Sequence, residues 1–175
     1  MKATTKDLVT AALLAAITAV LAQIVLPIGP IPFNLAFLGV FLTGMILTPK
    51  WACFSTFAYI FMGLIGLPVF AGFNGGLGVL VGSTGGYIFG YIFLAVLTSL
   101  GRNKKWYFCG LFMLLGVLVA YTFGTVWFMI LTKNSLATSL AYCVTPFIIP
   151  DLAKGVCGYL VGKAVNTRLK FSSAN

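Results

Sequence analysis

Long apolar runs follow one another along this chain, separated by short stretches rich in Pro, Gly, Lys or Arg. The first run, from Leu8 to Leu26, shows no alternation of polar and apolar positions. A transmembrane β-strand would alternate over about ten residues, whereas a membrane-spanning helix needs about 17–25 apolar residues. The pattern therefore predicts an all-α integral membrane protein, a single domain over residues 1–175 that forms a six-transmembrane-helix bundle. The six segments, of which the second and third are short, are 8–26, 33–47, 51–66, 85–100, 106–131 and 151–168.

Composition and charge fit a membrane protein and indicate its orientation. The chain is 61% hydrophobic and 7% charged, against about 25% charged residues in soluble domains. With six helices, nine basic residues fall on the side that holds both termini, and Lys133 falls on the other. This bias predicts that both termini are cytoplasmic in a multi-pass protein of the cell membrane. Basic patches beside apolar runs also argue against a nucleic-acid partner. The nine residues are Lys2, Lys6, Lys50, Arg102, Lys104, Lys105, Lys163, Arg168 and Lys170.

Two further features limit the chemistry that the chain can perform. It has no histidine, and its four cysteines stand singly in apolar segments, so we expect no metal site and interpret the cysteines as small buried residues. Residues 8–22 after Lys2 and Lys6 could be a cleaved signal peptide, but the apolar run continues to Leu26 and we interpret this helix as retained. With no second intramembrane acid to pair with Asp151, catalysis is hard to build. We therefore expect no catalytic residues, no cofactor and no enzyme activity.

A glycine-rich stretch, Gly66 to Gly90, contains nine glycines and is too apolar for open water. Irregular backbone at membrane depth is tolerated where it is buried in protein or lines a cavity. One interpretation is a lid that folds over the helix ends and approaches a ligand closely. The other is helix packing through small residues spaced four apart, and both can hold. The spaced glycines are Gly78, Gly82, Gly86 and Gly90.

Asp151 and Lys154 are the most informative residues of the sequence. Asp151 follows Pro150 and falls in the first turn of the last segment, where a carboxylate is favoured by the helix dipole. One interpretation is therefore that Asp151 caps the helix and forms an i,i+3 ion pair with Lys154. Lys154 lies a turn deeper, where an unpaired ammonium costs about 2.5–3.5 kcal/mol, and such residues usually face a cavity. A carboxylate accepts and an ammonium donates hydrogen bonds, so the pair suits a ligand with both functions, such as a cyclic urea or an amide.

Polar and aromatic residues from other parts of the sequence are further candidates for the ligand site. Asn74 can both donate and accept, although a turn residue at positive φ is the alternative for it. We also expect aromatic and small polar side chains to wall the pocket. The predicted ligand-binding residues are Asp151, Lys154, Asn74, Phe73, Phe70, Gly75, Thr84 and Tyr87, with Ser83, Tyr121 and Trp127 as further candidates.

Two segments of this chain resemble a known family. "GLPVFAGFNGGLGVLVGSTGGYIFGY" (66–91) is similar to the signature loop of BioY, the biotin-specific S-component of energy-coupling-factor (ECF) transporters, and "PFIIPDLAKG" (146–155) is similar to the segment at that family's last helix. Ser83 stands where BioY proteins commonly have proline. The resemblance implies a six-helix S-component fold, biotin as the ligand near the outer face, and contacts to biotin from Asn74, Asp151 and Lys154.

The resemblance also implies partners, namely a transmembrane coupling protein and two ABC ATPases. The ATPases must be separate chains because no P-loop motif occurs here. S-components dock the coupling protein through small residues on the first helix, although internal packing would use the same residues. The candidates are Ala11, Ala15 and Ala19 on one stripe and Ala12 and Ala16 on its neighbour. A solitary carrier, or an S-component for another small heterocyclic vitamin, is the alternative function.

Overall fold

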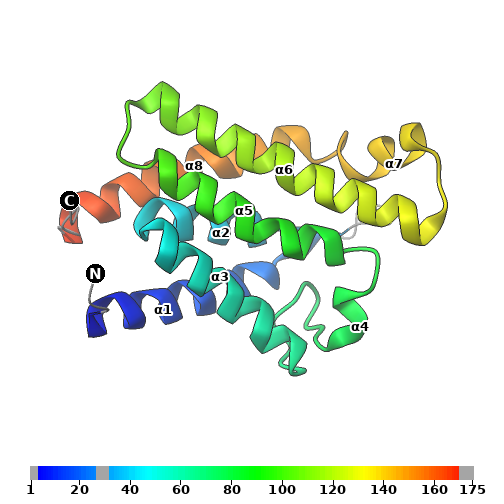
Figure 1. The fold of residues 1–175 in the computed structure, drawn as a ribbon, viewed down its shortest axis with the longest axis horizontal. Coiled ribbons are helices and arrows are strands. Elements are labelled where there is room, and N and C mark those ends of the chain that lie inside the picture. Colours follow the sequence, from blue (N-terminus) through cyan, green and yellow to red (C-terminus); the bar gives the residue numbers. More distant parts are fainter. Residues whose placement is uncertain (1–3, 27–31, 170–175) are drawn as a thin grey trace.

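A computed structural model describes residues 4–26 and 32–169 of the chain, and these residues are mostly helical. Within these two ranges there are eight helices and one short antiparallel hairpin (Figure 1). The elements in chain order are α1 (Thr5–Ala22), β1 (Val25–Leu26), β2 (Phe33–Asn34), α2 (Ala36–Ile46), α3 (Pro49–Leu64), α4 (Leu77–Leu80), α5 (Gly85–Gly101), α6 (Trp106–Thr132), α7 (Leu136–Cys143) and α8 (Ile148–Leu169).

The predicted helices are found, and the prediction of an all-helical fold is confirmed. The six longer helices α1, α2, α3, α5, α6 and α8 follow the order of the six predicted segments. Some predicted boundaries are wrong. Residues 25–26 and 33–34 were assigned to helices and instead pair as β1 and β2, and α8 begins at Ile148, three residues before the predicted Asp151. The side chain of Asn34 accepts a hydrogen bond of 2.9 Å from the N–H of Ala36, where α2 begins, three residues later than predicted.

The number of membrane spans is not settled by helix length. Among the described helices, α1 and α6 are long and apolar enough to cross a bilayer, and α7 with α8, bent by 47°, gives a third. With 11 residues, α2 rises only about 16 Å, roughly half of the ~30 Å hydrocarbon core. Six membrane spans and cytoplasmic termini therefore stay predictions.

The short helix α2 lies in the centre of the bundle. It packs against α1, α5 and α8, and nine of its 11 residues are buried. Carbonyl groups at a helix C-terminus have no partner within the helix, and here side chains from other helices supply one. Ser99 donates to the carbonyl of Leu47 at 2.5 Å and Arg102 to that of Ile46 at 2.7 Å, while Asn166 donates to that of Met45. These contacts allow α2 to end inside the protein.

The helices α5 and α6 lie side by side and antiparallel, and glycines allow their close contact (Figure 1). A methyl group added at Gly90 would lie 2.8 Å from Cα of Ala120, and one added at Gly86 would lie 2.5 Å from the carbonyl oxygen of Phe123. Neither position has room for a side chain. The packing interpretation is therefore confirmed for Gly86 and Gly90.

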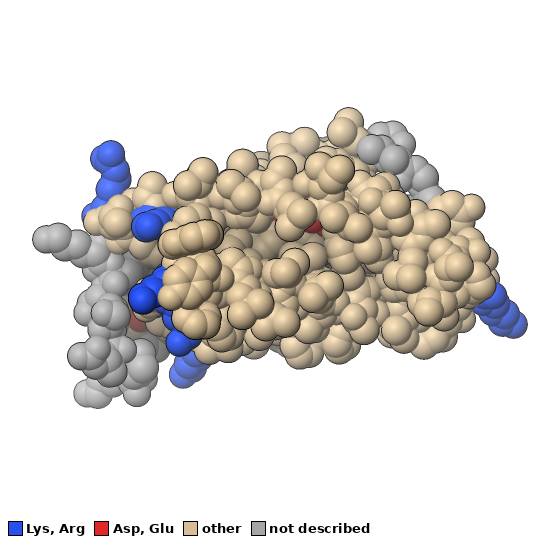
Figure 2. All heavy atoms as spheres, turned by 90° about the horizontal axis from the view of Figure 1, so that it is seen from above, with Lys and Arg blue, Asp and Glu red and all other residues tan. Residues whose placement is uncertain are grey.

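Basic side chains gather at one end of the molecule. The N-terminal part of α1, the C-terminal part of α8 and the turn between α5 and α6 all lie at this end, whereas α4 and α7 lie at the other (Figure 1). Figure 2 shows the Lys and Arg side chains of one face concentrated at this first end. We call it the basic end. The structure thus agrees with the charge bias of the sequence, and the membrane side that the basic end faces stays a prediction.

Candidate functional site

The ion pair predicted on the last segment is present and buried. Asp151 lies in the first turn of α8 and Lys154 one turn further, so that both side chains project from the same face. The ammonium of Lys154 lies 2.7 Å from Oδ1 of Asp151. Asp151 is 4% exposed and Lys154 is 7% exposed. A buried pair is costly to desolvate, so it needs further polar partners around it.

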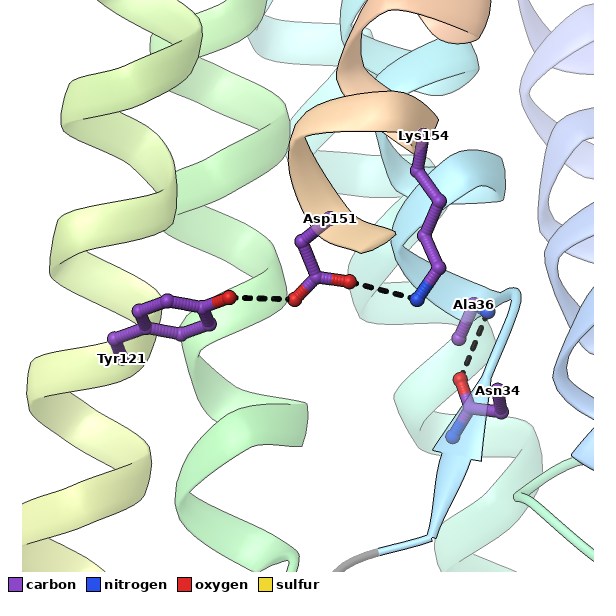
Figure 3. A network of polar contacts seen from close by, with 5 residues as sticks. All are labelled: Asn34, Ala36, Tyr121, Asp151 and Lys154. Carbon is purple, nitrogen blue, oxygen red and sulfur yellow. Dashed lines mark hydrogen bonds and ion pairs between the residues drawn. The ribbon is translucent and has the colours of Figure 1, made fainter. Parts of the chain in front are cut away.

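Those partners come from α6 and from the segment before α2. The hydroxyl of Tyr121 donates to Oδ2 of Asp151 at 2.8 Å, so both carboxylate oxygens have a partner (Figure 3). The ammonium of Lys154 lies 3.9 Å from the ring centroid of Phe33 and 5.9 Å from that of Phe37. Aromatic faces attract a cation, and the attraction grows when water is excluded. The pair is therefore held in place by α6, β2 and α2.

A cavity of about 300 Å³ lies against this pair. That volume is at the lower end of the ~300–1,000 Å³ typical of small-molecule sites, and aromatic rings with a few polar groups form its wall. The lining residues come from β2 and the residue before it, from α2, α3, α5, α6, α7 and α8, from the turn between α7 and α8, and from the glycine-rich loop. They are Pro32, Asn34, Phe37, Tyr59, Phe70, Ala71, Asn74, Val79, Gly82, Ser83, Thr84, Tyr87, Ile88, Tyr91, Tyr121, Cys143, Phe147, Asp151 and Lys154.

The structure brings most of the predicted residues together at this cavity. Asp151, Lys154, Asn74, Phe70, Thr84 and Tyr87 line it, and so do the further candidates Ser83 and Tyr121. Phe73 and Gly75 are not among the lining residues of the described chain. Phe73 is 71% exposed, and Gly75 lies against the carbonyl of Leu67. Trp127 packs on Phe89 of α5 instead, and its indole N–H donates to the carbonyl of Gly82, in the loop before α5, at 2.9 Å.

Asn74 lies in a turn and lines the cavity, but it does not have the positive φ that the turn interpretation expected. Its side-chain amide donates to the carbonyl of Ala71 at 2.8 Å, which closes a turn, and its side chain also lines the cavity. The residues with positive φ in this turn are Gly72, at 71°, and Phe73, at 58°, and not Asn74. The remaining amide oxygen of Asn74 is thus the atom that can accept a ligand hydrogen bond.

The glycine-rich loop supplies part of the cavity wall, and its role as a lid that approaches a ligand stays a prediction. A side chain of the α1 terminus holds it in place. The side-chain oxygen of Gln23 accepts from the N–H of Phe73 at 2.7 Å, and its amide donates to the carbonyls of Ala19 at 2.9 Å and Pro68 at 3.4 Å. One side chain therefore connects α1 to the loop that covers the cavity.

Sequence reasoning missed several wall residues. Asn34 was assigned to a helix, although Asn commonly bonds the backbone two residues on in a turn, as it does here with Ala36. Its side-chain amide lies on the Lys154 side of the network (Figure 3). Phe37, Tyr59 and Tyr91 pack on one another, with ring centroids 5.4 Å apart for Phe37 and Tyr91 and 6.4 Å for Tyr59 and Tyr91. No local pattern distinguishes these rings from the many other aromatic residues of the chain.

The alanines of α1 divide into a buried and an exposed set. Ala11 and Ala15 are 0% and 2% exposed, and the carbonyl of Ala11 accepts from the hydroxyl of Ser55 on α3 at 2.7 Å. Ala19 is half-buried. These three therefore pack within the chain, as the alternative interpretation expected, and Ala12 and Ala16 are the exposed pair. Among the cysteines, Cys109 and Cys143 are buried as predicted, whereas Cys53 is half-buried and Cys157 is exposed.

A helical membrane bundle with an aromatic cavity that ends at a buried ion pair defines a small-molecule binding component. The model of the BioY family matches residues 1–171. Relatives include the "Probable biotin transporter BioY" of Pyrococcus horikoshii, 39% identical over 90% of this chain and 94% of the relative, and the "Biotin transporter BioY" of Thermotoga maritima, 35% identical over 89% and 93%. A crystal structure described as the S-component for biotin from an ECF-type ABC transporter matches with a TM-score of 0.87 and 28% identity, over 95% of both chains. The chain belongs to the BioY family.

Proposed function

We propose that this chain takes up biotin, as the membrane-embedded S-component that binds the vitamin for an ECF-type transporter. The observation that carries the proposal is the buried Asp151–Lys154 pair at the end of an aromatic cavity. Family membership supports the same function, since relatives over about nine-tenths of the chain are biotin transporters.

The ureido ring of biotin matches the free hydrogen-bonding capacity of the pair. The ring offers two N–H donors and one carbonyl acceptor. A carboxylate has about four acceptor positions, and Asp151 uses two of them for Lys154 and Tyr121, which leaves two for the ureido N–H groups. The ammonium of Lys154 has three donors and gives one to Asp151, so another can reach the ureido oxygen.

The rest of the cavity suits the rest of the vitamin. The rings of Phe37, Tyr59 and Tyr91 give an apolar wall for the sulfur-containing ring and the aliphatic chain. Ser83, Thr84 and Asn74 add polar groups from the loop side. We therefore place the ureido ring against α8 and the carboxylate chain toward the loop. The cavity-lining loop lies away from the basic end, so the positive-inside rule puts the site in the outer half of the membrane.

The same function requires partners that this chain does not contain. A coupling protein would dock on α1 through Ala12 and Ala16, because small residues four apart let a second helix approach closely. Two ABC ATPases would supply the energy. Cofactors are not needed for binding of this kind, which rests on preformed hydrogen bonds and apolar contact.

Calorimetric titration of biotin into the purified chain tests the proposal. We expect nanomolar affinity for the wild type, since a mostly enclosed ligand with several satisfied hydrogen bonds can reach that range. Asp151→Ala should weaken binding by about 2–4 kcal/mol, or about 30- to 700-fold, because it removes two acceptors and leaves a buried ammonium unpaired.

Asp7→Ala is the matched control, because it removes the other acid of the chain. Asp7 caps α1 at the exposed basic end, where it accepts from the N–H of Thr4 at 3.3 Å. Its loss should leave biotin affinity unchanged. Equal biotin affinities for the wild type and Asp151→Ala would show that the Asp151–Lys154 pair does not bind the vitamin. A diamine analogue of biotin lacks the ureido carbonyl and should bind far more weakly than biotin. This comparison tests whether the site recognises the ureido group.

A further inference from the structure

A second hollow, of about 240 Å³, lies between α6 and α8 and also borders Asp151. Figure 2 looks down on these two helices and shows acidic atoms at the bottom of a hollow near the middle of the molecule. Asp151 is the one residue that this hollow shares with the biotin cavity. We call it the α6–α8 groove, and it is lined by Phe41, Trp106, Gly110, Met113, Leu114, Val117, Asp151, Leu152, Gly155, Val156 and Tyr159.

The groove is apolar and open toward the surface of the bundle. Leu114, Leu152 and Val156, which line it, are 44%, 53% and 59% exposed. On α6 it extends from Trp106 to Val117, a rise of about 16 Å. That length is close to one leaflet of a bilayer, whose two leaflets together have a hydrocarbon core of about 30 Å. The groove thus has the length and the chemistry of a single acyl chain.

The end of the groove away from Asp151 is basic and aromatic. Trp106, 73% exposed, and Tyr159 mark this end, as aromatic residues do at membrane interfaces. Lys105 directly precedes Trp106 at the start of α6. The ammonium of Lys163 lies 3.3 Å from the hydroxyl of Tyr159. An apolar channel with two lysines near this end, one of them against the lining residue Tyr159, fits an amphiphile whose head carries negative charge.

We propose that the α6–α8 groove binds one acyl chain of an anionic phospholipid from the leaflet at the basic end. Lys105 and Lys163 hold the phosphate, and Trp106 and Tyr159 lie at the level of the glycerol. The chain end reaches the neighbourhood of Asp151. The lipid therefore covers the charged pair on the side that faces the bilayer and keeps water away from it.

Native mass spectrometry of the full chain, delipidated and then given equal amounts of dioleoyl-phosphatidylglycerol or dioleoyl-phosphatidylcholine, tests the headgroup. The two lipids have the same acyl chains, so a difference reports the charge. We expect the wild type to retain one phosphatidylglycerol and much less phosphatidylcholine. Lys105→Gln/Lys163→Gln should lower phosphatidylglycerol retention by at least about tenfold, since each lysine contributes about fivefold at a membrane surface. Lys50→Gln/Lys133→Gln removes the same charge away from the groove and should change nothing.

A bulky side chain in the groove tests the acyl chain. A methyl group added at Gly110 meets no atom within 4 Å, so a side chain can begin there, and Gly110→Leu and Gly110→Phe place bulk in the groove. Both should abolish retention of the lipid. Leu115→Phe adds bulk at an exposed position of α6 outside the groove and should retain it. The proposal is overturned if the Gly110 variants retain lipid as the wild type does, if both lipids are retained equally, or if a second copy of the chain is lost in the Gly110 variants instead of a lipid.

Discussion

The carboxylate of Asp151 organises the site at the scale of single residues. One carboxylate oxygen lies 2.7 Å from the ammonium of Lys154, and the other accepts a hydrogen bond of 2.8 Å from the hydroxyl of Tyr121. Asp151 and Lys154 could be identified from the sequence as site candidates because charged residues are rare and costly at membrane depth. Tyr121 was named only as a possible wall residue, and its hydrogen bond to Asp151 could not be foreseen, because a neutral aromatic residue carries no comparable cost. Asn34, which lines the same cavity, was not named at all. Sequence reasoning therefore identifies the charges of such a site more surely than the neutral groups around them.

The role of Tyr121 gives a prediction at this scale. Tyr121→Phe keeps the ring but removes the hydroxyl that donates to Asp151, so the carboxylate is less well fixed. A hydrogen bond to a charged group contributes about 1.5–3 kcal/mol, and we expect a loss of biotin affinity of about tenfold or more by calorimetry. Tyr142→Phe, at an exposed position on α7, is the control and should bind as the wild type does. Unchanged affinity in Tyr121→Phe would show that this hydroxyl does not support the site.

At the scale of elements, the glycine-rich stretch after α3 both packs helices and forms part of the cavity wall. Gly86 and Gly90 belong to α5 and pack on α6, whereas residues between 70 and 84 line the cavity. Spacing alone predicted the packing, since small residues four apart lie on one helix face. Spacing could not predict the attachment of the loop to α1, because Gln23 and Phe73 are far apart in sequence and meet only in the folded chain.

Gln23 should therefore control how firmly the loop is held. Gln23→Ala removes the acceptor for the N–H of Phe73 and the donor to Pro68. We expect faster amide hydrogen exchange in residues 66–76 and a higher dissociation rate of biotin, since a less ordered cover opens more often. Thr10→Ala is the control, because the hydroxyl of Thr10 bonds within α1, to the carbonyl of Lys6 at 2.8 Å. Amide hydrogen exchange at the wild-type rate in Gln23→Ala would show that this side chain does not hold the loop.

At the scale of the whole molecule, the binding cavity and the basic end lie apart. Biotin would enter beside the glycine-rich loop, while the termini and most basic residues lie at the other end (Figures 1 and 2). Charge bias predicted this polarity from the sequence alone. The internal order of the bundle was not predictable, because α2 is buried by contacts with α1, α3, α5 and α8, and its C-terminal end is capped by side chains from α5 and α8.

Exposed small residues on α1 give a prediction for the complete transporter. Ala12→Trp/Ala16→Trp should block the close approach of a coupling-protein helix and abolish biotin uptake by cells that depend on the vitamin. Biotin affinity of the purified chain should stay within about twofold of the wild type, because these residues lie outside the cavity. Leu118→Trp, an exposed position on α6, is the control for added bulk. Normal uptake by the double variant would place the docking surface elsewhere.

A structure of the chain with biotin bound tests the assignment of the charged pair most directly. We predict that both ureido nitrogens lie within about 2.7–3.2 Å of the carboxylate of Asp151, and that the ureido oxygen lies within the same distance of Nζ of Lys154 or of the Asn34 amide. The carboxylate chain of the vitamin should point toward Ser83 and Thr84. A bound biotin whose carboxylate meets Lys154, with its ureido ring away from Asp151, would contradict the account.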